Sequence, residues 1–195
     1  MIRFCDVFFS LLGLIVLSPI FVIIALCIVL DSRGGVFYRQ VRVGRDGKDF
    51  QLFKFRSMAS GADKKGLITV GAKDSRVTRV GYFLRKYKLD ELPQLLNVVR
   101  GEMSLVGPRP EVRKYVDMYT VEQRKVLAVA PGITDYASIE YADENTILGQ
   151  ASDPDRAYVE QIMPDKIRYN MKYINNRCLK EYFKIIFLTL MKIVK

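Results

Sequence analysis

Residues 73–111, KDSRVTRVGYFLRKYKLDELPQLLNVVRGEMSLVGPRPE, contain the pattern that decides the fold of this chain. Apolar side chains recur at every third or fourth position over residues 76–88, which predicts a helix with one apolar face. A second helix is expected over 93–101, because Pro favours the first helical position and Gly the position after the last. Residues 103–110 cannot continue it, since they contain one Gly and two Pro.

Asp90 and Glu91 stand between the two predicted helices and follow a very basic stretch that includes Arg85. Two carboxylates beside cationic side chains can hold a divalent cation, approach phosphate oxygens or attack phosphorus. The alternative is structural, because acidic residues in the first turn of a helix are favoured by its dipole and are common. The chain has no His, which excludes Ser-His-Asp and Cys-His catalysis, an HExxH zinc site and an imidazole general base.

A further candidate residue is Arg109, in the loop Gly107-Pro108-Arg109-Pro110. A rigid loop that presents one guanidinium group suits bidentate recognition of a phosphate. The alternative is a structural turn whose Arg side chain is solvated.

Upstream, residues 37–43 and 49–55 are rich in aromatic and β-branched side chains. Together with the turn signal Asp46-Gly47 between them, they predict a β-hairpin. Residues 59–75 are polar and contain Gly, which predicts a loop.

The run from Val7 to Leu30 carries no formal charge and, as a straight helix, would be long enough to cross a hydrocarbon core. Ser18-Pro19 lies in its middle, and a Pro inside a helix kinks or breaks it. Two arrangements remain open, a kinked spanning helix and a re-entrant helix-break-helix that enters and leaves by one face. Basic residues concentrate after the run, so the positive-inside rule places the rest of the chain in the cytoplasm under either arrangement.

Downstream of the central stretch, residues 111–129 are expected to be helical and residues 133–152 to form a polar connection. Asp153-Pro154 and Met163-Pro164 are typical of the N-terminal ends of two further helices. Residues 180–195 are apolar with interspersed Lys, which suits an amphipathic helix at a membrane interface or, equally, one buried against the domain.

The chain has 195 residues with 31 Lys and Arg against 21 Asp and Glu, a net charge of +10. Residues 33–88 and 166–195 are basic, whereas residues 89–165 are acidic. A basic block beside a membrane segment, without a nucleic-acid recognition motif, favours anionic lipid or ligand over nucleic acid. Three widely spaced Cys indicate reduced thiols rather than a disulfide framework. The sequence therefore predicts a mostly helical α+β fold with one hairpin.

Taken together, residues 73–111 resemble the bacterial sugar transferase family, the monotopic phosphoglycosyl transferases that act on polyprenol phosphate. The resemblance extends upstream through GGVFYRQVRVGRDGKDFQLFKFRSM at 34–58 and to the break at Ser18-Pro19. It also includes PGIT at 131–134 and the basic, apolar C-terminal segment, so it covers essentially the whole chain.

This resemblance implies transfer of a sugar-1-phosphate from a UDP-sugar to undecaprenyl phosphate, with Mg²⁺ as cofactor. Asp90 would be the nucleophile that expels UMP, and Glu91 would help Asp90 to hold Mg²⁺. Arg85 and Arg109 match basic positions of the family motif and would bind phosphates.

The resemblance also favours the re-entrant arrangement. Residues 1–32 would form the re-entrant membrane helix, and residues 33–195 a catalytic domain on the cytoplasmic face of the bacterial inner membrane. The partners would be the two substrates and membrane lipids, with no nucleic acid, and a homodimer stays open.

One segment departs from the family pattern. After PGIT many members continue with Gly-Trp-Ala-Gln and an Asn-Gly-Arg-Asn-like loop, whereas residues 135–144 here read DYASIEYADE, with Ala142 near the place of the Arg. Contacts made by that Arg cannot be carried over, and a different nucleotide-sugar preference is expected. Two other functions remain open: a membrane-tethered module that binds lipid or a partner without catalysis, and a hydrolase that uses water as acceptor.

Overall fold

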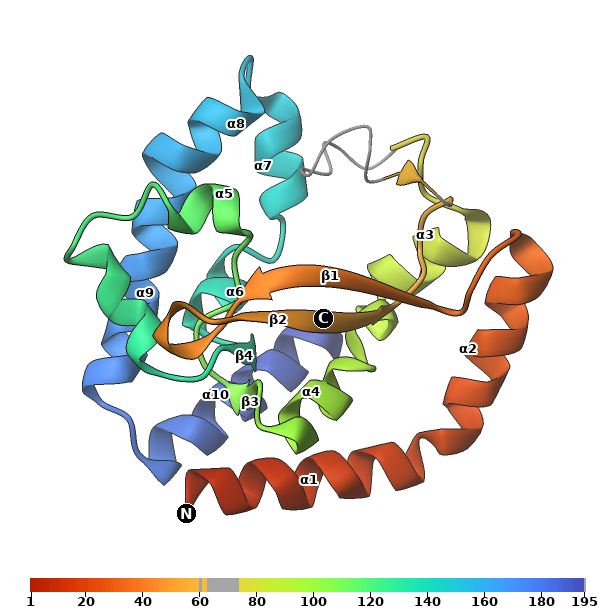
Figure 1. Ribbon diagram of the computed structural model, residues 1–195, viewed down its shortest axis with the longest axis horizontal. Helices are drawn as coiled ribbons and strands as arrows, with labels where there is room; N and C mark the ends of the chain where they lie inside the picture. Colours follow the sequence, from red (N-terminus) through yellow and green to blue (C-terminus); the bar gives the residue numbers. More distant parts are fainter. Residues whose placement is uncertain (60, 63–73, 195) are drawn as a thin grey trace.

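The described part of the chain is mostly helical, with two small two-stranded sheets (Figure 1). A computed structural model describes residues 1–59, 61–62 and 74–194, so most of the predicted loop 59–75 lies outside the described residues. The α-helices are α1 (Ile2–Val16), α2 (Ser18–Asp31), α3 (Arg79–Lys86), α4 (Gln94–Arg100), α5 (Arg113–Val116), α6 (Tyr136–Glu140), α7 (Glu144–Gln150), α8 (Pro154–Ala157), α9 (Met163–Asn175) and α10 (Leu179–Val194). The strands are β1 (Phe37–Val43), β2 (Asp49–Phe55), β3 (Ser104–Val106) and β4 (Gly132–Thr134). Short 3₁₀ segments are η1 (Arg45–Gly47), η3 (Leu89–Glu91) and η4 (Gln123–Ala128), and η5 (Tyr158–Ile162) is a π-helical segment.

The N-terminal apolar run is broken where the sequence predicted a break. Helices α1 and α2 meet at Leu17 and are bent by 61°. Ser18 Oγ donates a hydrogen bond to the carbonyl of Ile15 at 2.8 Å, and Pro19 lies in the first turn of α2. Among the described residues, no single helix is both long and apolar enough to cross a membrane. Helices α1 and α2 are long and apolar enough only when they are taken together.

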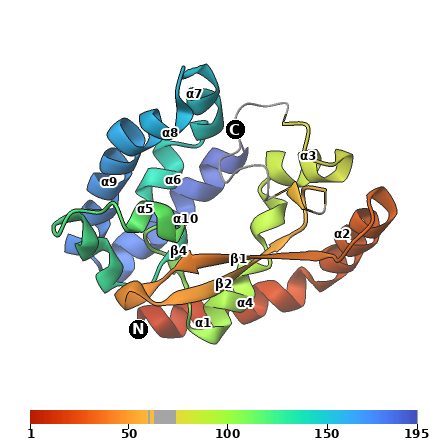
Figure 2. The ribbon, with the colours of Figure 1, turned by 45° about the horizontal axis from the view of Figure 1, so that its top comes forward.

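The predicted hairpin is confirmed with the predicted bounds. Strands β1 and β2 pair antiparallel from Phe37 opposite Phe55 to Val43 opposite Asp49. The turn places Asp46 at φ 58° and Gly47 at φ 73°, the left-handed region that Asp and Gly tolerate best. The hairpin runs across the molecule, with α2 and α3 at one end and α5 to α9 gathered at the other (Figure 2).

Helices α3 and α4 confirm the two predicted helices of the central stretch, with α3 starting later than expected. The Thr78 side chain accepts a hydrogen bond from Gly81 N and so begins α3 at Arg79. Gly101, at φ 87°, ends α4 as predicted.

A second sheet was not predicted. Strands β3 and β4 pair in parallel, with Ser104 opposite Gly132 and Val106 opposite Thr134. The two backbones approach so closely that a Cβ on Gly132 would lie 2.1 Å from Gly107 N. Strands of three residues carry too little periodicity to be recognised before the chain brings them together.

The predicted helix over 111–129 is wrong in most of its length. Only α5 and the 3₁₀ segment η4 are helical there. Thr120 N donates to the Gln123 side chain and Gln123 N to Thr120 Oγ1, a reciprocal cap that starts a new turn instead of continuing α5.

The predicted connection over 133–152 is also wrong, because it contains β4, α6 and α7. Asp135 accepts a hydrogen bond from Ser138 N and caps α6, a signal present in the sequence that the prediction did not use.

Both helix starts predicted further on are confirmed. Asp153 accepts a hydrogen bond from Arg156 N and caps α8. Helix α9 begins at Met163 with Pro164 in its first turn, directly after the π-helical segment η5. Helix α10 buries Tyr182 and Ile185 while Phe183 and Phe187 are exposed, so it packs on the domain and presents a second apolar face.

Helix α1 is attached to the rest of the molecule through a buried carboxylate. Asp6 is 2% exposed, and its Oδ1 accepts hydrogen bonds from Ser104 Oγ, Leu105 N and Tyr182 OH at 2.8 to 2.9 Å. At the other end of the bent pair, Asp31 Oδ2 accepts from Val80 N at the start of α3. The bent pair is therefore fixed at both ends.

Replacement Asp6→Ala should destabilise the protein, because it leaves three buried donors without an acceptor, at about 1–3 kcal/mol for such a loss. Tyr182→Phe removes only one of the three hydrogen bonds and should have a smaller effect. Thermal unfolding in detergent, followed by circular dichroism, measures both. An Asp6→Ala midpoint equal to that of the wild type would contradict the attachment of α1 by this residue.

Candidate active site

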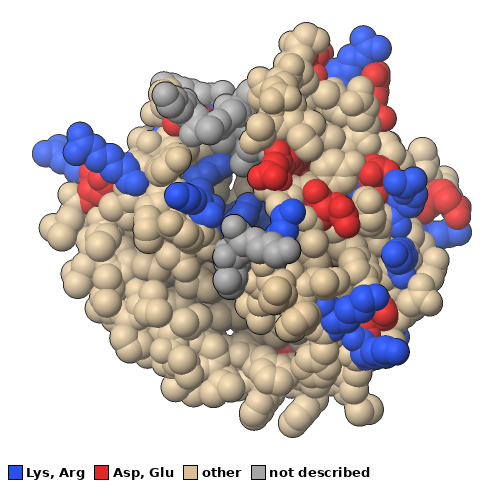
Figure 3. Space-filling view, turned by 180° about the vertical axis from the view of Figure 1, so that it is seen from behind, with Lys and Arg blue, Asp and Glu red and all other residues tan. Residues whose placement is uncertain are grey.

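A cavity of about 1260 Å³ lies between the hairpin, α3, η3, the loop after β3, the α6–α7 segment and α10. Figure 3 shows Lys and Arg side chains around a hollow in this face, above a broad surface without charged groups. Many large hydrophobic side chains of the bent pair α1–α2 and of the C-terminal helix α10 are exposed. The cavity therefore combines a cationic interior with an apolar surrounding.

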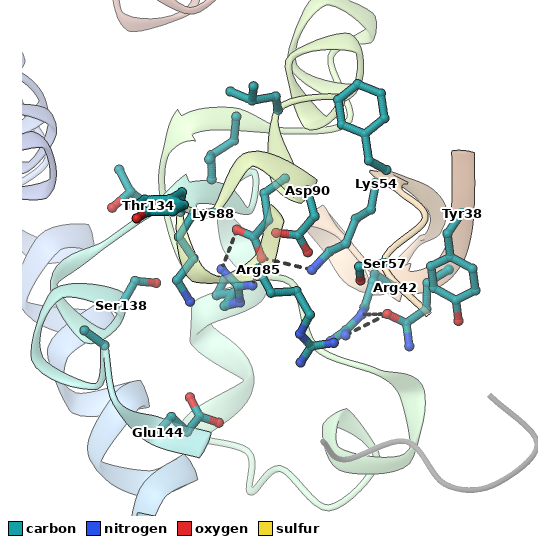
Figure 4. Close-up of a pocket in the computed structure, with 18 of the residues that line it drawn as sticks. Tyr38, Arg42, Lys54, Ser57, Arg85, Lys88, Asp90, Thr134, Ser138 and Glu144 are labelled. Carbon is teal, nitrogen blue, oxygen red and sulfur yellow. Dashed lines mark hydrogen bonds and ion pairs between the residues drawn. The ribbon is translucent and has the colours of Figure 1, made fainter. Parts of the chain in front are cut away.

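Asp90 lies in the wall of this cavity (Figure 4). Lys88, at φ 56°, turns the chain from α3 into η3 and so directs the two carboxylates inward. Asp90 is only 7% exposed, yet its carboxylate accepts no hydrogen bond from any residue in the described part of the chain. A buried carboxylate with free oxygens is costly, which marks it as available to a ligand.

Glu91, its neighbour, is bound by two cationic side chains. Its Oε1 accepts a hydrogen bond from Lys54 Nζ at 2.9 Å, and the Arg109 guanidinium binds both carboxylate oxygens, Oε2 at 3.2 Å. Lys54 comes from β2 and Arg109 from the loop after β3, so three segments far apart in the sequence meet here. The structure thus brings together three predicted site residues: Asp90, Glu91 and Arg109.

The packing of β2 and of the Arg109 loop holds both cations in place. Asn97 of α4 accepts a hydrogen bond from Phe53 N and donates one to the carbonyl of Gln51, which fixes β2 just before Lys54. The side chain of Asp135 accepts from Arg109 N at 3.1 Å, so α6 and the loop share one anchor. The Pro-flanked loop was predicted to be rigid, and this contact with a distant segment also holds it in place.

The two carboxylates have opposite pKa shifts. Burial raises the pKa of Asp90, an effect that the charge of Lys54 opposes. Burial alone would also raise the pKa of Glu91, but the charges and hydrogen bonds of Arg109 and Lys54 outweigh it and hold that pKa well below its usual range. Glu91 raises the pKa of Arg109 in turn. Opposite pKa shifts of this kind are typical of paired acids that have different chemical roles.

Arg85 is the fourth predicted site residue, and it lines the cavity from α3. Its charge lowers the pKa of Asp90, after the larger effects of burial, Lys54 and Glu91. Figure 4 shows the side chains of Arg85 and Lys88 directed into the same space below Asp90. These positions suit the binding of phosphate groups, because both cations reach the space in front of the free carboxylate.

Two cavity residues were missed by sequence reasoning, Lys54 and Arg42. Burial lowers the pKa of each, with Glu91 opposing the shift of Lys54 and Glu111 that of Arg42. For Arg42 the sequence does contain a signal, the two-residue period of FYRQVRV at 37–43, in which Tyr38, Gln40 and Arg42 share one face. All three line the cavity, and a polar face on a strand that packs against the domain points to a site.

The carboxylates of the cavity indicate what kind of metal site it can form. Among the described residues, no group of three or more His, Cys, Asp or Glu could hold one. Asp90 and Glu91 supply two carboxylates, and Mg²⁺ is commonly bound by one or two carboxylates together with water and substrate phosphates. The free oxygens of Asp90 fit such a shared site, whereas an all-protein cage does not fit.

Comparison with known proteins places this architecture in a family. The family model described as bacterial sugar transferase matches residues 1–195. The chain belongs to the bacterial sugar transferase family. This confirms the resemblance drawn from residues 73–111.

Two relatives of this chain have names that specify undecaprenyl phosphate as a substrate. It is 40% identical over 193 residues to the UDP-glucose:undecaprenyl-phosphate glucose-1-phosphate transferase of Klebsiella pneumoniae, covering 97% of this chain and 39% of that protein. It is 36% identical over 195 residues to the UDP-N-acetylgalactosamine-undecaprenyl-phosphate N-acetylgalactosaminephosphotransferase of Aeromonas hydrophila, covering 98% and 43%. The chain therefore spans about two fifths of the length of these two relatives.

The segment that departs from the family pattern forms part of the cavity wall. Ser138, Tyr141, Ala142, Asp143 and Glu144 all line it. Two of these residues are acidic, in a wall that faces cationic side chains. The segment thus places acidic side chains in the wall of the same cavity that Asp90 lines.

Proposed function

We propose that this protein transfers a sugar-1-phosphate from a UDP-sugar to undecaprenyl phosphate, as a membrane step in glycoconjugate assembly. The observation that carries the proposal is the pair of carboxylates, Asp90 free and Glu91 neutralised by Lys54 and Arg109, in a cationic cavity. The names of the two relatives support the same donor and acceptor classes.

The chemistry requires a nucleophile and a charged leaving group. An oxygen of the ionised Asp90 carboxylate would attack the β-phosphorus of the UDP-sugar, and the bond to the bridging oxygen would break, so that UMP leaves with the electron pair. A phosphate oxygen of undecaprenyl phosphate would then attack the same phosphorus and release the Asp90 carboxylate. The sugar-1-phosphate is thereby transferred, and the enzyme returns to its starting state.

The neighbouring residues would lower the charge repulsion of these steps. Arg85 and Lys88 would bind the diphosphate oxygens in front of Asp90, where their positive charges offset the approach of a carboxylate to an anionic phosphorus. Glu91, ionised because of its low pKa, would keep Lys54 and Arg109 in place. Asp90 and Glu91 would hold Mg²⁺, and the ion would supply positive charge that offsets the negative charge of the phosphates.

The membrane arrangement follows from the N-terminal pair. Residues 1–32 would form a re-entrant helix that is bent at Ser18-Pro19, and residues 33–195 the catalytic domain on the cytoplasmic face of the inner membrane. The 61° bend supports this, together with the exposed apolar side chains of α1, α2 and α10. Ile186, Thr189 and Leu190 of α10 line the cavity, so the acceptor phosphate could reach Asp90 from the membrane surface.

The direct test is to incubate the purified protein with UDP-sugars, Mg²⁺ and undecaprenyl phosphate and to measure UMP and lipid-linked product. Both should form with at least one donor. Absence of UMP with every donor would favour a membrane-tethered binding module, and UMP without lipid-linked product would favour a hydrolase.

Asp90→Asn should abolish turnover, because an amide is a poor nucleophile toward phosphorus. We expect UMP release to fall by at least about a thousandfold, the scale seen when a nucleophile is removed. Membrane association should persist, since Asp90 lies outside the apolar helices. Asp46→Asn, in the exposed hairpin turn, is the matched control and should retain activity. Substantial residual turnover in Asp90→Asn would refute the role assigned to this residue.

The rate of UMP release should fall with decreasing pH as Asp90 becomes protonated, because its attacking form is the carboxylate. Burial raises the pKa of Asp90 and the charge of Lys54 opposes that rise, so Lys54→Met should move the acidic limb of the pH profile to higher pH. Lys54→Arg keeps the positive charge and should leave the limb close to its wild-type position. An unmoved limb in Lys54→Met would show that another group controls it.

The re-entrant arrangement places both ends of the bent pair on the cytoplasmic side. In a variant without native Cys, a Cys in a tag at residue 1 should react with a membrane-impermeant thiol reagent only after the cells are permeabilised. A variant that retains only Cys178, which is exposed in the catalytic domain, is the internal control for a cytoplasmic position. Labelling of position 1 in intact cells, with Cys178 protected, would indicate a spanning helix.

A further inference from the structure

Glu144 lies on the wall of the cavity across from Asp90 (Figure 4). It is the first residue of α7, in the segment where the sequence departs from the family pattern. Its side chain is 28% exposed, so it is accessible from the cavity. The role proposed above for the carboxylate pair does not use Glu144.

A buried lysine fixes the position of the Glu144 carboxylate. Lys166 Nζ donates a hydrogen bond to Glu144 Oε2 at 3.0 Å, and Lys166 is itself only 8% exposed. The Lys166 ammonium also lies over the ring of Tyr158, 5.3 Å from its centroid. The second oxygen, Oε1, accepts no hydrogen bond from the residues that the structure describes. One oxygen is therefore anchored and the other is available.

A second polar atom on the same wall has no partner. Ser138 Oγ is buried without a hydrogen bond to any described residue, and Ser138 lines the cavity from α6. Buried hydroxyl groups are nearly always hydrogen-bonded, so an unpaired one in a cavity wall points to a ligand. Ser138 and Glu144 together offer a hydroxyl and a carboxylate oxygen to the same space.

The charge of Glu144 excludes one class of contact. The opposite wall carries Arg85 and Lys88, which suit the diphosphate, whereas a carboxylate repels phosphate oxygens. The available Glu144 oxygen can only accept a hydrogen bond, so its hydrogen-bond partner on a bound substrate is an O–H or N–H group. In a UDP-sugar, the groups of this kind next to the β-phosphate belong to the sugar.

We propose that Glu144, positioned by Lys166 and assisted by Ser138, binds the hydroxyl or amide N–H groups of the donor sugar and determines which UDP-sugar is used. This assignment rests on the function proposed above. It gives the divergent segment a specific role. A fixed carboxylate binds a sugar with a correctly placed hydrogen-bond donor more tightly than a sugar that lacks this donor.

The test compares kcat/KM for UDP-glucose, UDP-galactose, UDP-N-acetylglucosamine and UDP-N-acetylgalactosamine in the wild type and in Glu144→Gln. The preference of the wild type for its best donor over the next should shrink by roughly tenfold or more in Glu144→Gln, the scale of a lost hydrogen bond to a charged group. The inhibition constant of UMP should not rise, because UMP carries no sugar beyond its own ribose.

Two variants control for trivial effects. Glu140→Gln removes an equal charge from an exposed position in α6 that does not line the cavity, and it should leave donor preference unchanged. Glu144→Gln leaves Lys166 buried without its partner, so the double variant Glu144→Gln/Lys166→Met removes both charges and separates selectivity from folding. The double variant should lose the preference as Glu144→Gln does.

The outcomes distinguish this assignment from the proposed function. An active wild-type enzyme whose preference is unchanged in both Glu144 variants overturns the assignment alone. A parallel weakening of UMP inhibition would also overturn it, since Glu144 would then contact the nucleotide. A wild-type protein that releases no UMP from any donor would overturn the proposed function and this assignment with it.

Discussion

The ion pairs of Glu91 hold the site together, because they join segments that are far apart in the sequence. Lys54 comes from the hairpin, Glu91 from the turn between α3 and α4, and Arg109 from the loop after β3. Burying one carboxylate is costly, and two cations that donate hydrogen bonds to it offset that cost. Loss of either cation would leave charge uncompensated, so the cavity and the ion pairs depend on each other.

The same interaction separates two chemically similar neighbours. Glu91 is paired with Lys54 and Arg109 and stays ionised. Asp90 is buried beside it with free oxygens and a raised pKa. A carboxylate of raised pKa is the more basic of the two when ionised, and it faces the cationic space in which phosphates would bind. The difference between the two acids is a property of their partners, because their positions along the chain are adjacent.

The scaffold connects this cavity to the apolar helices. Buried Asp6 links α1 to β3 and α10, and Asp31 links the end of α2 to α3. Since β3 leads into the Arg109 loop and α3 into η3, the two attachments of the bent pair lie next to the two sides of the site. A re-entrant arrangement would therefore hold the carboxylates at a constant depth relative to a membrane surface.

The amino-acid sequence by itself determined the features that depend on a few neighbouring residues. These are the hairpin with its Asp46-Gly47 turn, the end of α4 at Gly101 and the break at Ser18-Pro19, because turn, cap and Pro effects act within one or two turns of chain. Only the tertiary structure decided the β3–β4 pairing, the short helices in place of 111–129, and the meeting of Lys54 with Glu91. Each of these depends on contacts between distant segments, and three-residue strands or a single Lys in a strand have no local pattern that specifies a partner.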